Sequence, residues 1–177
     1  NANNMSVNYA KKSIKLFLNN FENFLNKPNF NNSNKMLLCA NYSGKAINIS
    51  KTNVPHALSY YLASRLEIGH GHSVVVNISQ FLAFLYNRGY YSNKIVNKKF
   101  KLLFKIFKVK NFNELYKKIE KIKKISRLKV NFKKFNFDLI NEVDKIAKKT
   151  DPKRLGNCPI PIDKKDLKGI LLNNFEV

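Results

Sequence analysis

The chain has 177 residues and carries 33 Lys and Arg against 11 Asp and Glu, a formal net charge of +22. A hydrophobic content of 44% with 14 Phe and 8 Tyr excludes a disordered chain, and no stretch reaches the roughly 18 apolar residues of a membrane span. Only six Gly and five Pro interrupt long runs of helix formers, so we expect one all-α domain over residues 1–177, a multi-helix bundle.

Apolar periodicity predicts two helices in the first fifty residues. Over residues 6–26 an apolar side chain recurs every three or four positions, which is typical of a helix with one buried stripe. The stripe holds Ala10, Ile14, Phe17, Phe21 and Phe24. After a polar loop at 29–34, a second helix is predicted over 34–49. Its inward side is expected to hold Met36, Leu37, Ala40, Ser43, Gly44 and Ile47.

The middle of the chain predicts two more helices. Residues after Pro55 form a short helix, which Ile68 and Gly69 interrupt. Residues 74–86 are apolar nearly all round, which indicates a buried helix at the centre of the domain. Three consecutive β-branched valines at 74–76 leave a buried strand as the competing interpretation.

The remainder of the chain is basic and helical. Residues 94–134 carry sixteen Lys and Arg against two Glu, beside an apolar stripe, and Asn111 predicts a helix start near 112. The buried sides are expected to hold Phe100, Leu103, Phe104, Phe107, Leu115, Ile119, Ile122 and Ile125, with the lysines on the solvated face. Another helix is predicted over 137–149, with Leu139, Ile140, Val143, Ile146 and Ala147 inward. A Pro-rich loop then leads to a last helix capped by Asp163 and Asp166.

The two cysteines and the chain start indicate a cytoplasmic protein. Cys39 and Cys158 are far apart and only two, so reduced thiols are favoured over a disulfide. The first residues contain no apolar core of a signal peptide.

The strong positive charge raises nucleic acid as a partner. Arginine, the residue of bidentate phosphate and base recognition, occurs only at positions 65, 88, 127 and 154. Lysine and asparagine in excess are also what an AT-biased coding sequence produces. A basic nucleic-acid-binding module therefore stays an alternative, and it requires the lysines of 94–134 to share a face with exposed aromatic side chains.

All three histidines, His56, His70 and His72, lie within seventeen residues. His56 is near the start of one predicted helix and His70, fourteen residues on, near the start of the next. A helix and a turn can bring both imidazoles to one point, and a metal ion is the commonest reason to do so. The competing interpretation is a pair of packed core histidines.

This segment resembles the second metal-binding segment of the iron-containing (group III) alcohol dehydrogenases. Residues 55–72 read PHALSYYLASRLEIGHGH, and in that family a histidine, a short helix and a His-Gly follow one another at this fourteen-residue spacing. The run GKAINISKTNVPHALSYY and the doubled HGH are closest to the phosphonoacetaldehyde reductase-like branch. The tail DPKRLGNCPIPIDKKDLKGILLNNF is similar to the family's closing pattern of Arg-Leu, Asn-x-Pro and a last helix.

The resemblance implies a metal centre and an all-α C-terminal domain. His56 and His70 match two of the ligands of Fe(II), with Zn(II) as the alternative ion, and their second ring nitrogens need acceptors. The family set is one Asp and three His, so the other two ligands are expected upstream of Asn1. NAD(P)H would be bound mainly by a dinucleotide-binding domain that is also expected there.

Three further residues receive weaker roles. Tyr60 stands where many family members carry an active-site histidine near the nicotinamide, so it is a candidate for cofactor or substrate contact. His72 is a candidate for the substrate pocket or for proton transfer. Lys45 is a candidate for holding an anionic substrate group such as a phosphonate, although a lysine on a solvated helix face is the simpler interpretation.

We therefore expect the metal-binding helical part of an NAD(P)-dependent aldehyde reductase or alcohol dehydrogenase, acting on a small aldehyde such as phosphonoacetaldehyde. The missing N-terminal domain would be its partner, a homo-oligomer stays an open option, and the 177 residues alone would be inactive. The alternatives are a catalytically inactive remnant of the dehydrogenase fold and the basic nucleic-acid-binding module.

Overall fold

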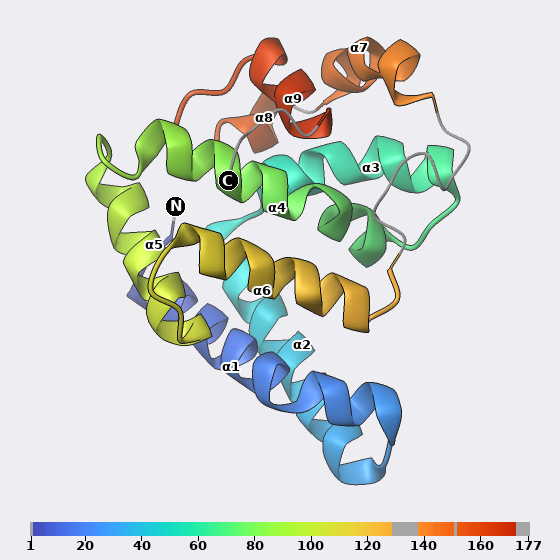
Figure 1. Cartoon of the computed structure of the whole chain (residues 1–177), viewed down its shortest axis with the longest axis vertical. Coiled ribbons are helices and arrows are strands. Elements are labelled where there is room, and N and C mark those ends of the chain that lie inside the picture. The colour runs from blue at the N-terminus through green and yellow to red at the C-terminus, as the bar shows by residue number, and fades with distance from the viewer. Residues whose placement is uncertain (1, 129–137, 151, 173–177) are drawn as a thin grey trace. The chain divides into compact units, whose positions relative to one another are not determined.

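Helices supply all the regular secondary structure of the described residues, 2–128, 138–150 and 152–172, in this computed structural model (Figure 1). The helices are α1 (Asn4–Asn26), α2 (Phe30–Ser50), α3 (Val54–Leu66), α4 (His70–Gly89), α5 (Lys94–Phe107), α6 (Phe112–Ile125), α7 (Leu139–Lys149), α8 (Pro152–Leu155) and α9 (Lys164–Leu171). The all-α prediction is confirmed. No helix in the described part of the chain is long and apolar enough to cross a membrane.

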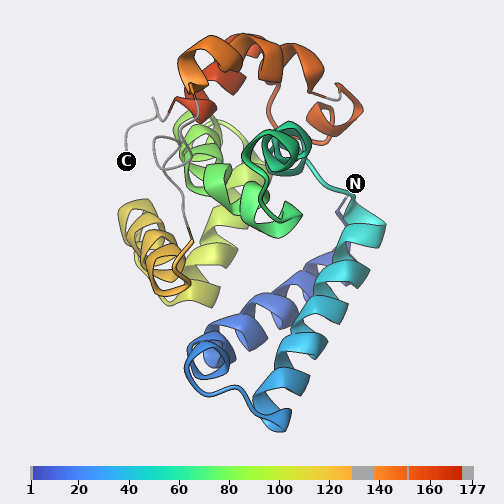
Figure 2. The same cartoon turned by 90° about the vertical axis from the view of Figure 1, so that its right-hand side faces the viewer.

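The chain divides into two compact units. The hairpin unit, residues 1–51 with 105–108, is built on the paired helices α1 and α2 (Figure 2). The histidine unit, residues 52–104 with 109–177, contains α3, α4 and the helices that follow. The histidine unit carries both predicted metal ligands, so its packing matters most for the site.

Helix α2 starts four residues earlier than predicted. The side chain of Asn29 accepts the backbone N–H of Asn32 at 3.0 Å, and the side chain of Asn32 accepts the N–H of Asn29 in return at 2.8 Å. This reciprocal capping satisfies two backbone donors that a helix start leaves unpaired. The prediction of a polar loop over 29–34 was wrong because these asparagines act as helix-starting residues.

The predicted inward side of α2 was wrong for most of its members, since only Met36 and Ser43 of that set are partly buried. Its buried residues are Asn32, Cys39 and Ala46, spaced seven apart, whereas Leu37 is 68% exposed. The hydroxyl of Ser13 in α1 donates to the Cys39 carbonyl at 2.9 Å, so Cys39 lies on the face of α2 that meets α1. Of the stripe predicted in α1, only Phe21 is fully buried.

The histidine unit is layered. Helices α3 and α4 pack together, and α7, α8 and α9 lie over the pair in both views (Figures 1 and 2). Fully buried side chains from four of these helices form the core; they are Leu58, Leu62, Phe84, Ile146, Leu167, Ile170 and Leu171. The capping box of Asp163 and Asp166 starts α9 as predicted. Ile140, predicted inward, is 76% exposed.

Helix α4 begins at His70 rather than at 74 and is a helix throughout, so the strand interpretation was wrong. Ser73, Asn77 and Ser79 are buried on it beside Phe81 and Phe84. The short helix α8 lies in the predicted Pro-rich loop. It starts at Pro152, whose missing N–H is harmless at the first helical position.

A buried ionic group joins α4 to α6. Lys123 is only 3% exposed, and its Nζ donates to Ser79 Oγ and to Glu120 Oε1, both at 2.7 Å. The Ser79 hydroxyl donates to the same carboxylate oxygen. The prediction that all lysines of this helix face solvent was therefore wrong for Lys123, because two partners compensate its burial.

We expect a double-mutant cycle on Glu120 and Lys123 to show strong coupling. Glu120→Ala leaves the Lys123 ammonium buried without its carboxylate and should cost about 1–3 kcal/mol of unfolding free energy. Lys123→Met fills the same space without a charge and should change stability by less than about 1 kcal/mol. The double variant should then be more stable than Glu120→Ala alone in urea unfolding. Additive losses would show that the two side chains act independently.

Candidate metal site

The two histidines are placed by helix starts. His56 is in the first turn of α3, directly after Pro55, and its side chain is partly buried. His70 is the first residue of α4 and is exposed. Both residues belong to the histidine unit, so their separation is set within one compact body.

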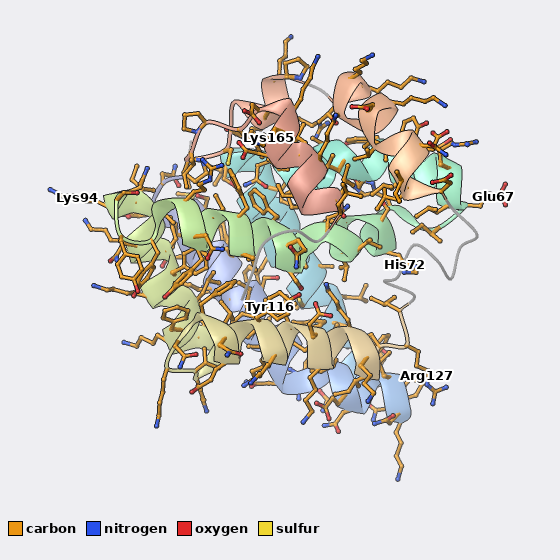
Figure 3. The ribbon with its side chains drawn as sticks, turned by 45° about the horizontal axis from the view of Figure 1, so that its top comes forward. Glu67, His72, Lys94, Tyr116, Arg127 and Lys165 are labelled. Atoms are coloured by element: carbon orange, nitrogen blue, oxygen red, sulfur yellow. The ribbon has the colours of Figure 1, made fainter. Side chains whose placement is uncertain are left out.

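A tight reversal after α3 brings His70 back to His56. Glu67 ends α3 in the left-handed conformation, at φ 51° and ψ 41°, and the N–H of Ile68 donates to the Ala63 carbonyl at 3.3 Å. The Glu67 N–H donates to the same carbonyl, so this is a left-handed helix end with a glutamate where glycine is usual. In Figure 3, Glu67 marks the end of α3 and His72 the first turn of α4. The chain folds back so that His70 Nδ1 lies 3.3 Å from Ser59 Oγ, in the middle of α3.

The two imidazoles lie close and are inclined to each other. Their ring centroids are 5.4 Å apart and the ring planes meet at 58°. Two imidazoles that bind one ion through nitrogens at about 2.0–2.1 Å, at a tetrahedral angle, have centroids about 5 Å apart. The centroid distance is therefore close to that of two imidazoles on one ion, and the Tyr60 ring lies at a similar distance from His70.

Ser59 contacts both histidines. Its hydroxyl donates to the His56 carbonyl at 2.8 Å, and its oxygen lies 3.3 Å from His70 Nδ1, where the tautomer of the imidazole decides which atom donates. When Nδ1 carries the proton and donates to Ser59, Nε2 of His70 keeps a lone pair, the form in which histidine binds a metal. The sequence predicted the need for such an acceptor but did not identify Ser59.

Tyr60 and Arg154 flank the histidine pair. The Tyr60 ring is 52% exposed, with its centroid 5.3 Å from that of His70, and the Arg154 guanidinium carbon lies 4.8 Å from the Tyr60 centroid. Arg154 also donates to Thr52 Oγ1 at 2.6 Å, and the Asn157 side chain donates to the Thr52 carbonyl at 2.9 Å. These bonds attach the α8 segment to the loop before His56. Only the resemblance of the tail pointed to Arg154.

The environment lowers the pKa of His56. Burial is the main cause, and the neighbouring His70 and Arg154 add unfavourable charge to the protonated form. A neutral imidazole is the form required of a metal ligand.

The other predicted residues lie apart from this pair or in the other unit. His72 is two positions beyond His70 on the same helix, a spacing that turns the two side chains to different faces. Lys45 belongs to the hairpin unit, where its Nζ lies 5.8 Å from the ring centroid of Tyr9. Among the described residues, no group of three or more His, Cys, Asp and Glu gathers closely enough to hold a metal ion.

The nucleic-acid alternative requires exposed aromatic side chains over residues 94–134, of which 129–134 lie outside the described residues. Within the described residues 94–128, no aromatic side chain is exposed, since Phe100, Phe104 and Phe112 are buried and Phe107 and Tyr116 partly so. Stacking platforms for bases are therefore missing from this part of the surface.

Comparison with known proteins identifies the family. The sequence model of the Fe-containing alcohol dehydrogenase family, C-terminal, matches residues 1–175, so the chain belongs to this family. An iron-containing alcohol dehydrogenase from Thermococcus thioreducens has the same fold, with a TM-score of 0.78 at 16% identity. The match covers 98% of this chain and 45% of that one, so the chain spans less than half the length of that relative. None of the curated proteins compared matches the sequence.

The lowered pKa of His56 predicts how the metal-free chain responds to acid. The unfolded state binds the proton more readily, since its histidine titrates near 6.5, so unfolding is favoured as the pH falls below that value. Above it both states carry neutral His56 and the effect vanishes. We expect His56→Asn to reduce the loss of stability in this range, as measured by urea unfolding with a chelator present. His72→Asn removes a nearby imidazole and serves as the control. An unchanged pH dependence in His56→Asn would contradict the assignment.

Proposed function

We propose that this chain is the metal-binding helical part of an NAD(P)-dependent, iron-type alcohol dehydrogenase or aldehyde reductase. The observation that carries the proposal is the placement of the His56 and His70 rings 5.4 Å apart, with Ser59 Oγ 3.3 Å from His70 Nδ1. Family membership supplies the class of reaction, and this geometry supports a working metal site in this particular chain.

The residues present fit a divalent metal. Neutral imidazoles suit both Fe(II) and Zn(II), and the orientation of His70 through Ser59 matches the hydrogen-bonded ligands of known metal centres. We propose that the remaining ligands lie in a part of the protein outside these 177 residues. When bound, the ion would polarise a substrate carbonyl or lower the pKa of an alcohol.

The neighbouring side chains would shape the reaction space. Tyr60, which contacts the His70 ring, presents a half-exposed aromatic surface beside the site and is the candidate for contact with the nicotinamide or the substrate. Arg154 and the α8 segment hold the loop that leads into His56. His72 as a proton carrier and Lys45 as a substrate anchor remain weaker proposals.

The substrate is proposed to be a small aldehyde, with phosphonoacetaldehyde suggested by the sequence resemblance of residues 44–72. The nicotinamide cofactor is proposed to bind mainly to a dinucleotide-binding domain elsewhere in the whole protein. The solved relative matches the chain over 45% of its own length, which leaves room for such a domain.

Metal titration tests the site directly. We expect the chain to bind Zn(II) or, without oxygen, Fe(II), and we expect His56→Asn and His70→Asn each to weaken binding at least about tenfold, because each removes a ligand. Ser59→Ala should weaken it by about 10–100-fold through loss of ring orientation. His72→Asn, matched in chemistry, should leave the affinity within about twofold. Equal affinities in all variants would favour the inactive remnant.

Activity of the isolated chain tests whether it is sufficient. We expect the purified 177 residues, loaded with Fe(II) or Zn(II), to show no NAD(P)H oxidation with a small aldehyde, since two histidines leave the metal incompletely held. The measurement is NAD(P)H absorbance over time against a buffer blank. Robust, metal-dependent turnover that His70→Asn abolishes would overturn this expectation.

A further inference from the structure

A second feature of the histidine unit is an open pocket between α3 and α7. Its volume is about 590 Å³, within the range of small-molecule sites. Tyr60, Tyr61, Ser64 and Arg65 of α3 line one side, and residues of α7 line the other. The two helices lie next to each other in both ribbon views (Figures 1 and 2).

The pocket is positively charged. Arg65, Lys145 and Lys149 are cations and Glu142 is the one carboxylate among its lining residues, so three charges against one leave a net charge of +2. Lys149 lies over the Tyr61 ring with its Nζ 5.4 Å from the centroid. Within the described residues, Lys149 has no carboxylate partner. These cations surround a concave space, where their fields add.

The pocket already holds one anion of the protein itself. The Glu142 carboxylate accepts the Tyr61 hydroxyl, and it lies 2.9 Å from Lys145 Nζ and 3.6 Å from an Arg65 nitrogen. These contacts, the Tyr61 hydrogen bond first among them, hold the pKa of Glu142 below its usual range. Tyr61, Lys145 and Arg65 thus surround the Glu142 carboxylate, and Lys149 adds a further positive charge beside them.

From this geometry we propose that the pocket binds a phosphate-class dianion, either free or as the end group of a small molecule. Its residual charge of +2 matches a dianion. Arg65 offers the planar fork, and Lys145 and Lys149 the point charges, that phosphate oxygens accept. The two tyrosine rings give an organic phosphate apolar walls. The site needs no metal.

The pocket and the histidine pair share one residue. Tyr60 lines the pocket and contacts the His70 ring at 5.3 Å between centroids. A ligand held by Arg65 and Lys149 would therefore end beside the candidate metal site. The proposal goes beyond the dehydrogenase assignment, because anion binding is measurable whether or not the histidines bind metal.

The test is calorimetric titration of the chain with inorganic phosphate and with phenyl phosphate at fixed ionic strength. We expect saturable one-to-one binding, at least about tenfold weaker in Lys149→Ala and in Arg65→Ala, since each removes a charged hydrogen-bond donor to the ligand. Lys148→Ala changes the same charge on the same helix outside the pocket and should stay within about twofold. Circular dichroism and urea midpoints check that each variant is folded.

Two further variants make the result decisive. Glu142→Gln raises the pocket charge to +3 and should tighten phosphate binding several-fold. His70→Asn should leave it unchanged, which separates the anion site from the metal site. Tighter binding of phenyl phosphate indicates an organic ligand, and equal binding indicates free phosphate; both support the pocket. Binding that does not saturate, or that Lys148→Ala weakens as much as Lys149→Ala, would overturn the proposal and indicate general attraction to a basic surface.

Discussion

The left-handed turn at Glu67 is the constraint on which the histidine unit depends. It reverses the chain direction after α3, so that the first residue of α4 lies beside the middle of α3 rather than beyond its end. A non-glycine residue in this conformation costs roughly 1–2 kcal/mol. Burial of Leu58, Leu62 and Phe84 where α3 meets its neighbours offsets that cost. The turn therefore holds two histidines together that fourteen residues of helix and loop would otherwise separate.

Helix α3 organises both sites. Successive side chains on a helix point about 100° apart, so Tyr60 turns toward His70 while Tyr61 turns toward Glu142 on α7. The candidate metal site and the cationic pocket thus lie on adjoining faces of one short helix. Because α7 and α8 both contact α3, the C-terminal part of the chain supports both faces at once.

Sequence reasoning succeeded where the signal is local. Apolar periods and capping residues gave most helices, and the histidine spacing pointed to the pair that the fold brings together. It failed where partners come from distant segments. The residues near Lys123 in the sequence do not predict its contact with Ser79, which is 44 residues away. In the same way, the residues near Cys39 do not predict its contact with Ser13. Ser59 was missed because a serine three residues after a histidine is a common pattern that predicts no contact. Its contact with His70 arises only from the chain reversal at Glu67.

The many asparagines of the chain have a structural role at helix starts. Side chains of Asn3, Asn29, Asn93 and Asn111 each accept a backbone N–H at a helix start. Lysine, the other abundant residue, is a good helix former whose long stem covers apolar surface. A coding sequence rich in A and T encodes more asparagine and more lysine. Asparagine caps helix starts, and lysine covers the outer faces of helices. The chain shares its fold with the solved relative at only 16% identity, so this architecture accommodates an exterior rich in lysine and asparagine.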